Sequence, residues 1–135
     1  MVRQCARFWC QGAFDMSNHL YQAIEQSLLG KPDKEIICWE GSWISAGELV
    51  KNVHRMASCL ERLGVHSGAR VSAQIEKHPA NIILYLAVLR LDAIFLPLNT
   101  AYTRQELAYF LSDASPVLHV GREEKDGDVV KDLPP

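Results

Sequence analysis

Apolar residues recur every three or four positions in four stretches of the chain, and this period predicts four helices. The stretches are 17–29, 45–63, 80–91 and 103–114. The second has the clearest signals: Ser45 and Glu48 form a capping box, the apolar positions fall on one stripe that ends at Leu63, and Gly64 is suited to stop a helix in a left-handed conformation. A second capping box, from Thr103 to Glu106, predicts the start of the last helix.

The other two predicted helices differ in how much of their surface must be covered. The first is expected to bury a single stripe, formed by Leu20, Ala23, Ile24, Ser27 and Leu28. The third, which Pro79 opens at a first-turn position, is apolar nearly all round. A helix of this kind needs neighbours on several sides.

Short apolar runs between the helices predict strands. Two of them, 35–40 and 43–45, flank Gly41-Ser42 and predict a β-hairpin. Three more, 69–75, 94–98 and 116–120, alternate with helices, which predicts two successive β-α-β units and a parallel sheet of the doubly wound type. The expected fold class is therefore α/β, with flanking helices and a short N-terminal hairpin.

Composition narrows the class of protein. At 135 residues, with 48% hydrophobic and 22% charged residues, the chain has the size of one globular domain. A net charge of −2 without a clustered basic face argues against a nucleic-acid partner. The longest apolar stretch, 82–91, is shorter than the roughly 20 residues that span a bilayer, so we expect a soluble protein without a membrane partner. The spacing of Cys5, Cys10, Cys38 and Cys59 predicts neither a metal site nor a disulfide framework.

Several short segments together resemble one known family. They are MSNHLYQAI at 16–24, LERLGV at 60–65, IEK at 75–77, LYLA at 84–87 and PLNTAYT at 97–103. In this order and spacing they resemble malonyl-CoA synthetases, which belong to the AMP-forming acyl-CoA ligases. The resemblance covers about 16–120 and corresponds only to the front of the family's enzymes, the start of the large N-terminal domain.

The resemblance implies an enzyme that activates a small-molecule carboxylate with ATP and Mg2+ and passes the acyl group to coenzyme A. The family binds ATP with a Ser/Thr/Gly-rich loop ending in lysine, an acidic residue at the ribose and a lysine on a mobile C-terminal domain, and none of these motifs is found in this sequence. The chain alone is therefore expected to be inactive, to contain no catalytic or metal-binding residue, and to bind none of these cofactors tightly. We expect residues 16–121 to form the N-terminal part of a ligase domain, residues 1–15 a disordered extension, and residues 122–135 a polar loop.

Candidate binding residues follow from a rule for open parallel sheets, which bind ligands beyond the carboxyl ends of their strands. The loop after the second parallel strand is on the side where coenzyme A approaches in the family, so the resemblance implies four substrate- or CoA-facing residues: Asn99, Thr100, Tyr102 and Thr103. Lys77 and His78 follow the first parallel strand and are candidates to contact an anion, because a helix N-terminus comes next. A purely structural interpretation stays open for all six, as helix cap, turn former, core cover or solvated loop.

Two alternatives to a ligase piece also stay open. The chain can be a non-catalytic product that self-associates or binds a full-length partner through an exposed sheet edge, or a small α/β binding module. The four histidines at 19, 54, 66 and 119 are expected to be surface or local capping groups. The expected location is the cytoplasm. Residues 1–15 carry Arg3 and Arg7 and no acidic residue before Asp15, which is weakly typical of a transit peptide and gives the mitochondrion as the alternative location. The other explanation of these residues is an upstream start codon, with Met16 as the effective beginning of the protein.

Overall fold

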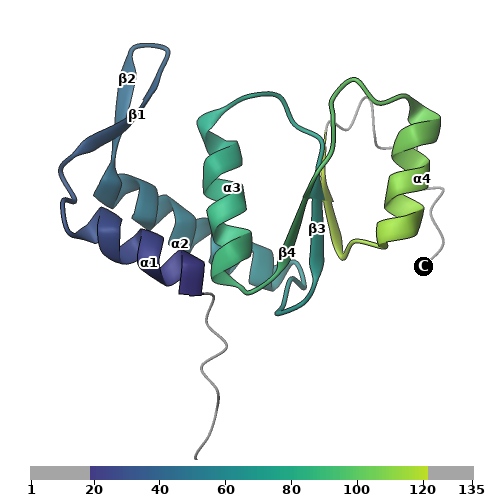
Figure 1. Cartoon of the computed structure of the whole chain (residues 1–135), viewed down its shortest axis with the longest axis horizontal. Helices are drawn as coiled ribbons and strands as arrows, with labels where there is room; N and C mark the ends of the chain where they lie inside the picture. The colour runs from purple at the N-terminus through teal and green to yellow at the C-terminus, as the bar shows by residue number, and fades with distance from the viewer. Residues whose placement is uncertain (1–18, 122–135) are drawn as a thin grey trace, which may run out of the picture.

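The computed structural model describes residues 19–121, so the predicted extension at 1–15 and the predicted polar loop at 122–135 lie outside the described residues (Figure 1). The elements follow one another in this order: α1 (His19–Leu29), β1 (Glu35–Trp39), β2 (Ser42–Ser45), α2 (Ala46–Arg62), β3 (Arg70–Ala73), α3 (Pro79–Arg90), β4 (Ile94–Pro97), α4 (Arg104–Ala114) and β5 (Leu118–Val120). Each predicted helix and strand is present, with its ends shifted by a few residues.

The three later strands form one parallel sheet in the order β4-β3-β5. Val71 of the central strand is opposite Phe95 on one side and Leu118 on the other. Because β4 and β5 lie on opposite sides of β3, the chain crosses the sheet in one direction through α3 and returns through α4. These two helices therefore cover opposite faces, as Figure 1 shows, and the predicted doubly wound α/β fold is confirmed.

The main core lies between the sheet and the layer formed by α1, α2 and α3. Its buried side chains come mostly from α2, β3 and α3. A smaller cluster of Leu98, Leu107 and Leu111 packs α4 against the other face. The central strand is buried on both faces, so Ser72 is as inaccessible as its apolar neighbours.

Both predicted helix starts are confirmed, and the second shows both hydrogen bonds of the predicted capping box. The Ser45 hydroxyl accepts a hydrogen bond from the Glu48 amide at 3.2 Å. At the other capping box, the Thr103 hydroxyl accepts from the Glu106 amide, while the Glu106 carboxylate accepts from the Thr103 amide at 2.8 Å. This last pair fixes the point at which the loop after β4 becomes α4.

Two details of the prediction are wrong. The hairpin turns at Glu40-Gly41, one residue earlier than expected, because Trp39 pairs with Ser42 and both turn residues have the positive φ of a two-residue hairpin turn. On α1 the buried residue is Tyr21, whereas Leu20 is exposed. The tyrosine ring buries a larger apolar surface and brings its hydroxyl to a partner on the same helix, so the helix is rotated away from the expected stripe.

No helix between residues 19 and 121 is both long enough and apolar enough to cross a bilayer.

Candidate functional site

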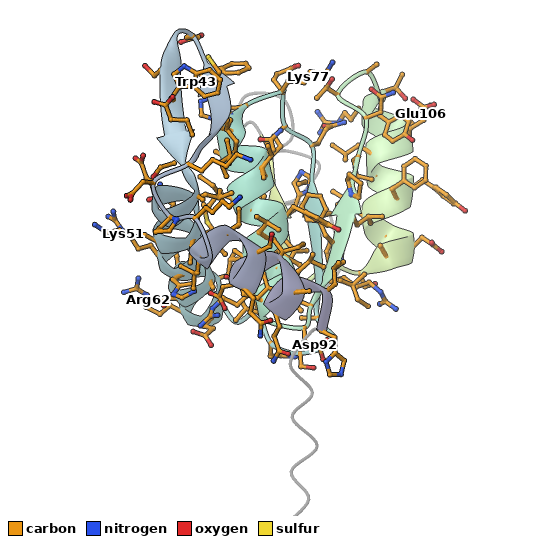
Figure 2. The ribbon with its side chains drawn as sticks, turned by 60° about the vertical axis from the view of Figure 1, so that its left-hand side comes forward. Trp43, Lys51, Arg62, Lys77, Asp92 and Glu106 are labelled. Carbon is orange, nitrogen blue, oxygen red and sulfur yellow. The ribbon has the colours of Figure 1, made fainter. Side chains whose placement is uncertain are left out.

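The loops that follow β3 and β4 lie at the same end of the parallel sheet. Figure 2 shows Lys77, in the first loop, and Glu106, just after the second, at the same end of the molecule. Gln74 joins the two loops: its side chain is 2% exposed, and its Nε2 donates a hydrogen bond to the Asn99 carbonyl oxygen at 2.7 Å. The sequence analysis did not single out Gln74. Gln74 follows directly after β3, and its bonding partner lies 25 residues away in the next loop, so no local pattern marks it.

The loop after β4 is a compact turn held by its own polar groups. The Asn99 side-chain oxygen accepts from the Ala101 amide at 2.9 Å, and the Asn99 carbonyl accepts from the Tyr102 amide at 3.1 Å. Thr103 caps α4, and Thr100 is half-buried. The structure therefore brings the four predicted residues of this loop together at one place. Their contact with a substrate stays a prediction.

Tyr102 occupies the outer part of this loop. Its ring is half-buried and stacks on Phe110 of α4, with centroids 4.9 Å apart. Stacking fixes the ring plane, while the remaining ring surface lies at the ligand-binding end of the sheet. Among the four residues, Tyr102 is the one whose side chain can contribute an aromatic face to a bound molecule.

The loop after β3 leads directly into α3. His78 caps that helix, because its Nδ1 accepts a hydrogen bond from the Ala80 amide at 3.0 Å, and its ring meets Trp39 of the hairpin edge-on at 5.5 Å. The Asn81 side chain donates to the Glu76 carbonyl oxygen at 2.6 Å, which closes the loop. Lys77 is exposed between these fixed points. Of the two predicted anion contacts, Lys77 is accessible, and His78 uses one ring nitrogen for the helix.

A polar pair lies inside the sheet. His119 of β5 is half-buried, and its Nδ1 is 2.8 Å from the hydroxyl of buried Ser72 on β3. The prediction that all four histidines are surface or capping groups is therefore wrong for His119. The error has a physical cause: β5 is so short that no period in its sequence reveals which of its residues face inward.

A second polar cluster joins the three helices of the other layer. The Glu25 carboxylate of α1 contacts Nε2 of His54 on α2, lies 3.7 Å from Arg90 of α3, and accepts a 3.0 Å hydrogen bond from the Tyr21 hydroxyl. Burial and the hydrogen bond to this carboxylate raise the pKa of Tyr21 to about 12. Burial alone would raise the pKa of Glu25, but the bonds from His54 and Tyr21 outweigh it and lower that pKa. The cluster is far from the two loops and acts on stability.

An apolar groove of about 630 Å³ lies beside β5. Its apolar lining comes from α2 and its cap, from α3 and from β5, and includes Met56, Leu60, Leu63, Leu84, Leu118 and Val120. We call it the edge groove. Gly121, the last described residue, also lines it.

The two loops offer a ligand only a few free groups. Among residues 19–121, no group of three or more His, Cys, Asp or Glu side chains is arranged to hold a metal ion. His78 Nδ1, Asn99 Oδ1 and the Thr103 hydroxyl are used in the internal hydrogen bonds given above. What the two loops offer a ligand is an exposed ammonium group at Lys77 and an aromatic face at Tyr102.

Comparison with known proteins decides the family. Residues 24–134 match the family model described as AMP-binding enzyme, which is most of the chain. The chain belongs to the AMP-binding enzyme family. Its fold is that of the N-terminal part of adenylate-forming enzymes, as predicted: apo MatB from Rhodopseudomonas palustris matches 85% of the chain with a TM-score of 0.79 and 38% identity. For ATP-bound MatB the TM-score is 0.77 and the identity 36%, over the same share of the chain.

Curated members of the family are also similar in sequence. Acetyl-coenzyme A synthetase 1 from Candida albicans is 30% identical over 82% of this chain, and tyrocidine synthase 1 from Brevibacillus parabrevis is 30% identical over 70% of it. The chain spans 23% of MatB, 17% of the synthetase and 9% of the tyrocidine enzyme. It therefore matches one part of each of these proteins.

Proposed function

We propose that this chain is the N-terminal part of a malonate–CoA ligase. The ligase would join malonate, ATP and coenzyme A into malonyl-CoA, AMP and diphosphate. A malonate oxygen attacks the α-phosphorus of ATP and diphosphate leaves; the thiol sulfur then attacks the acyl carbon of the malonyl-adenylate, and AMP leaves as the thiol proton is lost. Mg2+ would neutralise the phosphate charge in the first step.

The observation that carries the proposal is the likeness to MatB. Identity of 36–38% over 85% of the chain is higher than the 30% found with acetyl-coenzyme A synthetase 1 and with tyrocidine synthase 1. The sequence resemblance to malonyl-CoA synthetases agrees with it. Malonate carries a second carboxylate that acetate lacks, so a malonate ligase must also accommodate that second charge.

Within this proposal, the two loops position substrates and the chain supplies no reacting group. Tyr102, together with Asn99, Thr100 and Thr103, would face coenzyme A. The hydrogen bond from the buried Gln74 side chain to the Asn99 carbonyl holds this loop in place. Lys77 would attract phosphate groups through its exposed charge. Such residues affect the affinity and orientation of a substrate more than the chemical steps.

The test is substrate-dependent exchange of diphosphate into ATP by the full-length protein. Malonate, acetate and benzoate are compared at equal concentration, and kcat/KM is expected to be highest for malonate. A higher value for acetate or benzoate would overturn the malonate assignment and leave the family unchanged. Formation of malonyl-CoA, followed by mass spectrometry, checks the second step.

The 135-residue chain alone is expected to show no exchange above a blank without protein. The ATP-binding motifs of the family are not in its sequence. Exchange by the purified chain that persists through a further chromatography step would contradict this expectation.

A further inference from the structure

A cavity of about 300 Å³ lies between the hairpin and the start of α3. Its lining comes from β1, from the loop after β3 and from the first turn of α3, and it includes Ile37, Trp39, Lys77, His78 and Ile82. We call it the hairpin pocket. Figure 2 shows Lys77 at the end of the molecule where the hairpin, marked by Trp43, projects. The pocket therefore joins two segments that are distant in the sequence.

One wall of the hairpin pocket is apolar and aromatic. Ile37 and Trp39 are two residues apart on β1, so their side chains lie on the same face of the hairpin. Trp43 is paired with Cys38 and lies on the other face. Trp39 is 37% exposed, and its ring meets the His78 ring edge-on, at an interplanar angle of 66°. An edge-on contact covers less ring surface than stacking does, so Trp39 keeps an accessible aromatic surface.

The loop after β3 adds a positive charge and a hydrogen-bond donor. Lys77 is exposed and takes part in neither of the two ion pairs found among residues 19–121. Nδ1 of His78 accepts from the Ala80 amide, so the ring proton is on Nε2, which can donate to a ligand. None of the residues that line the pocket has a carboxylate. The charge that this lining favours in a ligand is therefore negative.

The two parts of the lining together define the ligand. An inorganic anion would use only Lys77 and His78 and would leave the apolar wall in contact with water. A neutral ring would use only the apolar wall. Both parts are used when one molecule carries a ring and an anionic group. The volume equals that of about ten water molecules in the liquid, which is room for one ring system with its anionic group.

We propose that the hairpin pocket binds a small molecule with a planar aromatic ring and one anionic group, a phosphate or a carboxylate. Trp39 would stack on the ring, and Ile37 and Ile82 would contact its edges. Lys77 and His78 would bind the anionic group. The lining includes none of the four loop residues that are proposed to face coenzyme A. The proposal thus gives Lys77 a ligand apart from that loop, and it does not depend on the malonate assignment.

The test titrates the isotope-labelled 135-residue chain with phenyl phosphate and follows the backbone and indole N–H signals by NMR. The Trp39 indole signal and the amide signals between residues 77 and 82 are expected to shift saturably, with a Kd of about 1 mM or below. The Trp43 indole signal should not move, because Trp43 lies on the other face of the hairpin. Glycerol 3-phosphate, which has no ring, and benzyl alcohol, which has no charge, should each bind at least about tenfold more weakly.

Two pairs of variants assign the binding to this pocket. Trp39→Ala should weaken the binding of phenyl phosphate about tenfold or more, because it removes the stacking surface. Trp43→Ala is the matched control, since it removes the other tryptophan of the same hairpin, which is 53% exposed. Lys77→Gln should weaken binding about two- to fivefold, and less at high salt, whereas Lys51→Gln, at an exposed lysine on α2, should not.

Circular dichroism and thermal unfolding of the four variants separate loss of binding from loss of fold. Because Lys77 is exposed, Lys77→Gln tests the site even where Trp39→Ala lowers stability. AMP and benzoate then distinguish the two sources of the ligand. Tighter binding of AMP assigns the anionic group to a phosphate, as in a nucleotide, and tighter binding of benzoate assigns it to a carboxylate.

Three results would overturn the proposal. They are the absence of a saturable shift up to about 10 mM phenyl phosphate, equally tight binding of glycerol 3-phosphate, and equal losses of binding in Trp39→Ala and Trp43→Ala. The titrations contain no ATP, malonate or coenzyme A. Their outcome is therefore separate from that of the exchange assay, which tests the proposed function.

Discussion

Replacing Glu25 by glutamine is expected to lower the free energy of unfolding by about 1 kcal/mol at pH 7. The Glu25 carboxylate, with a side chain 21% exposed, links α1 to His54 of α2 and to Arg90 of α3. A partly exposed ion pair contributes roughly 0.2–1 kcal/mol, and glutamine removes the pair with Arg90 and the carboxylate that contacts His54. Glutamine keeps a carbonyl oxygen for the Tyr21 hydroxyl, whereas Glu25→Ala loses that bond as well, for a total of about 2 kcal/mol.

The same substitution should change how stability depends on pH. Hydrogen bonds from His54 and Tyr21 keep the pKa of Glu25 below its ordinary value of 4.5, although burial works in the opposite direction. The folded protein therefore binds this proton more weakly than the unfolded chain does. The stabilisation by the carboxylate is fully present above pH 4.5 and is lost as the pH falls through the lowered pKa.

The assay is urea unfolding followed by circular dichroism at pH 7 and at several values below 4.5. The difference between the unmodified chain and Glu25→Gln should be present above pH 4.5 and should shrink as the pH falls through the lowered pKa of Glu25. Glu61→Gln is the control, because Glu61 is an exposed carboxylate on α2. Equal unfolding free energies for Glu25→Gln and Glu61→Gln at pH 7 would refute the reasoning.

Three further predictions concern other parts of the chain. Because the pKa of Tyr21 is raised to about 12, the neutral phenol stabilises the fold fully below pH 10, and this contribution is lost as the pH rises to about 12. The melting temperature of Tyr21→Phe should therefore fall less between these two pH values than that of the unmodified chain. Gln74→Leu should cost about 1–2 kcal/mol and increase hydrogen exchange at the Tyr102 amide, because the Asn99 carbonyl loses its buried donor; unchanged exchange would contradict the loop-joining role. In the proposed full-length ligase, Tyr102→Ala should raise KM for coenzyme A more than KM for malonate. Tyr109→Ala is the control: this side chain on α4 is 66% exposed, and its replacement should change neither KM. Equal effects of Tyr102→Ala on the two KM values would favour a packing role.

Local signals in the sequence predicted most of the fold. The caps at Ser45 and Thr103 lie within four residues each, so their hydrogen bonds depend little on the rest of the protein; the predicted capping box is confirmed in full at Thr103, and at Ser45 the hydroxyl-to-amide bond is confirmed. The alternation of strands and helices likewise predicted the parallel sheet. Periodicity was enough here because each element buries a face whose spacing is set by its own backbone geometry.

The failures share a different cause. The inward face of α1 depends on Tyr21 and on partners from two other helices, and the burial of His119 depends on the crossing from β4 back past β3. The link from Gln74 to Asn99 spans 25 residues. Such contacts are set by the packing of elements distant in sequence, so no pattern within a single element reveals them.

The division between local and distant contacts also bears on the candidate site. Thr103, Asn99 and His78 were predicted to face ligands, and the structure shows that each already has a bonding partner in its own loop or helix. Their polar groups therefore fix the shape of the two loops at the carboxyl end of the strands, where we propose that coenzyme A binds. It follows that substitutions at these three positions should act on substrate affinity through loop order, whereas Tyr102 and Lys77 can act by contact.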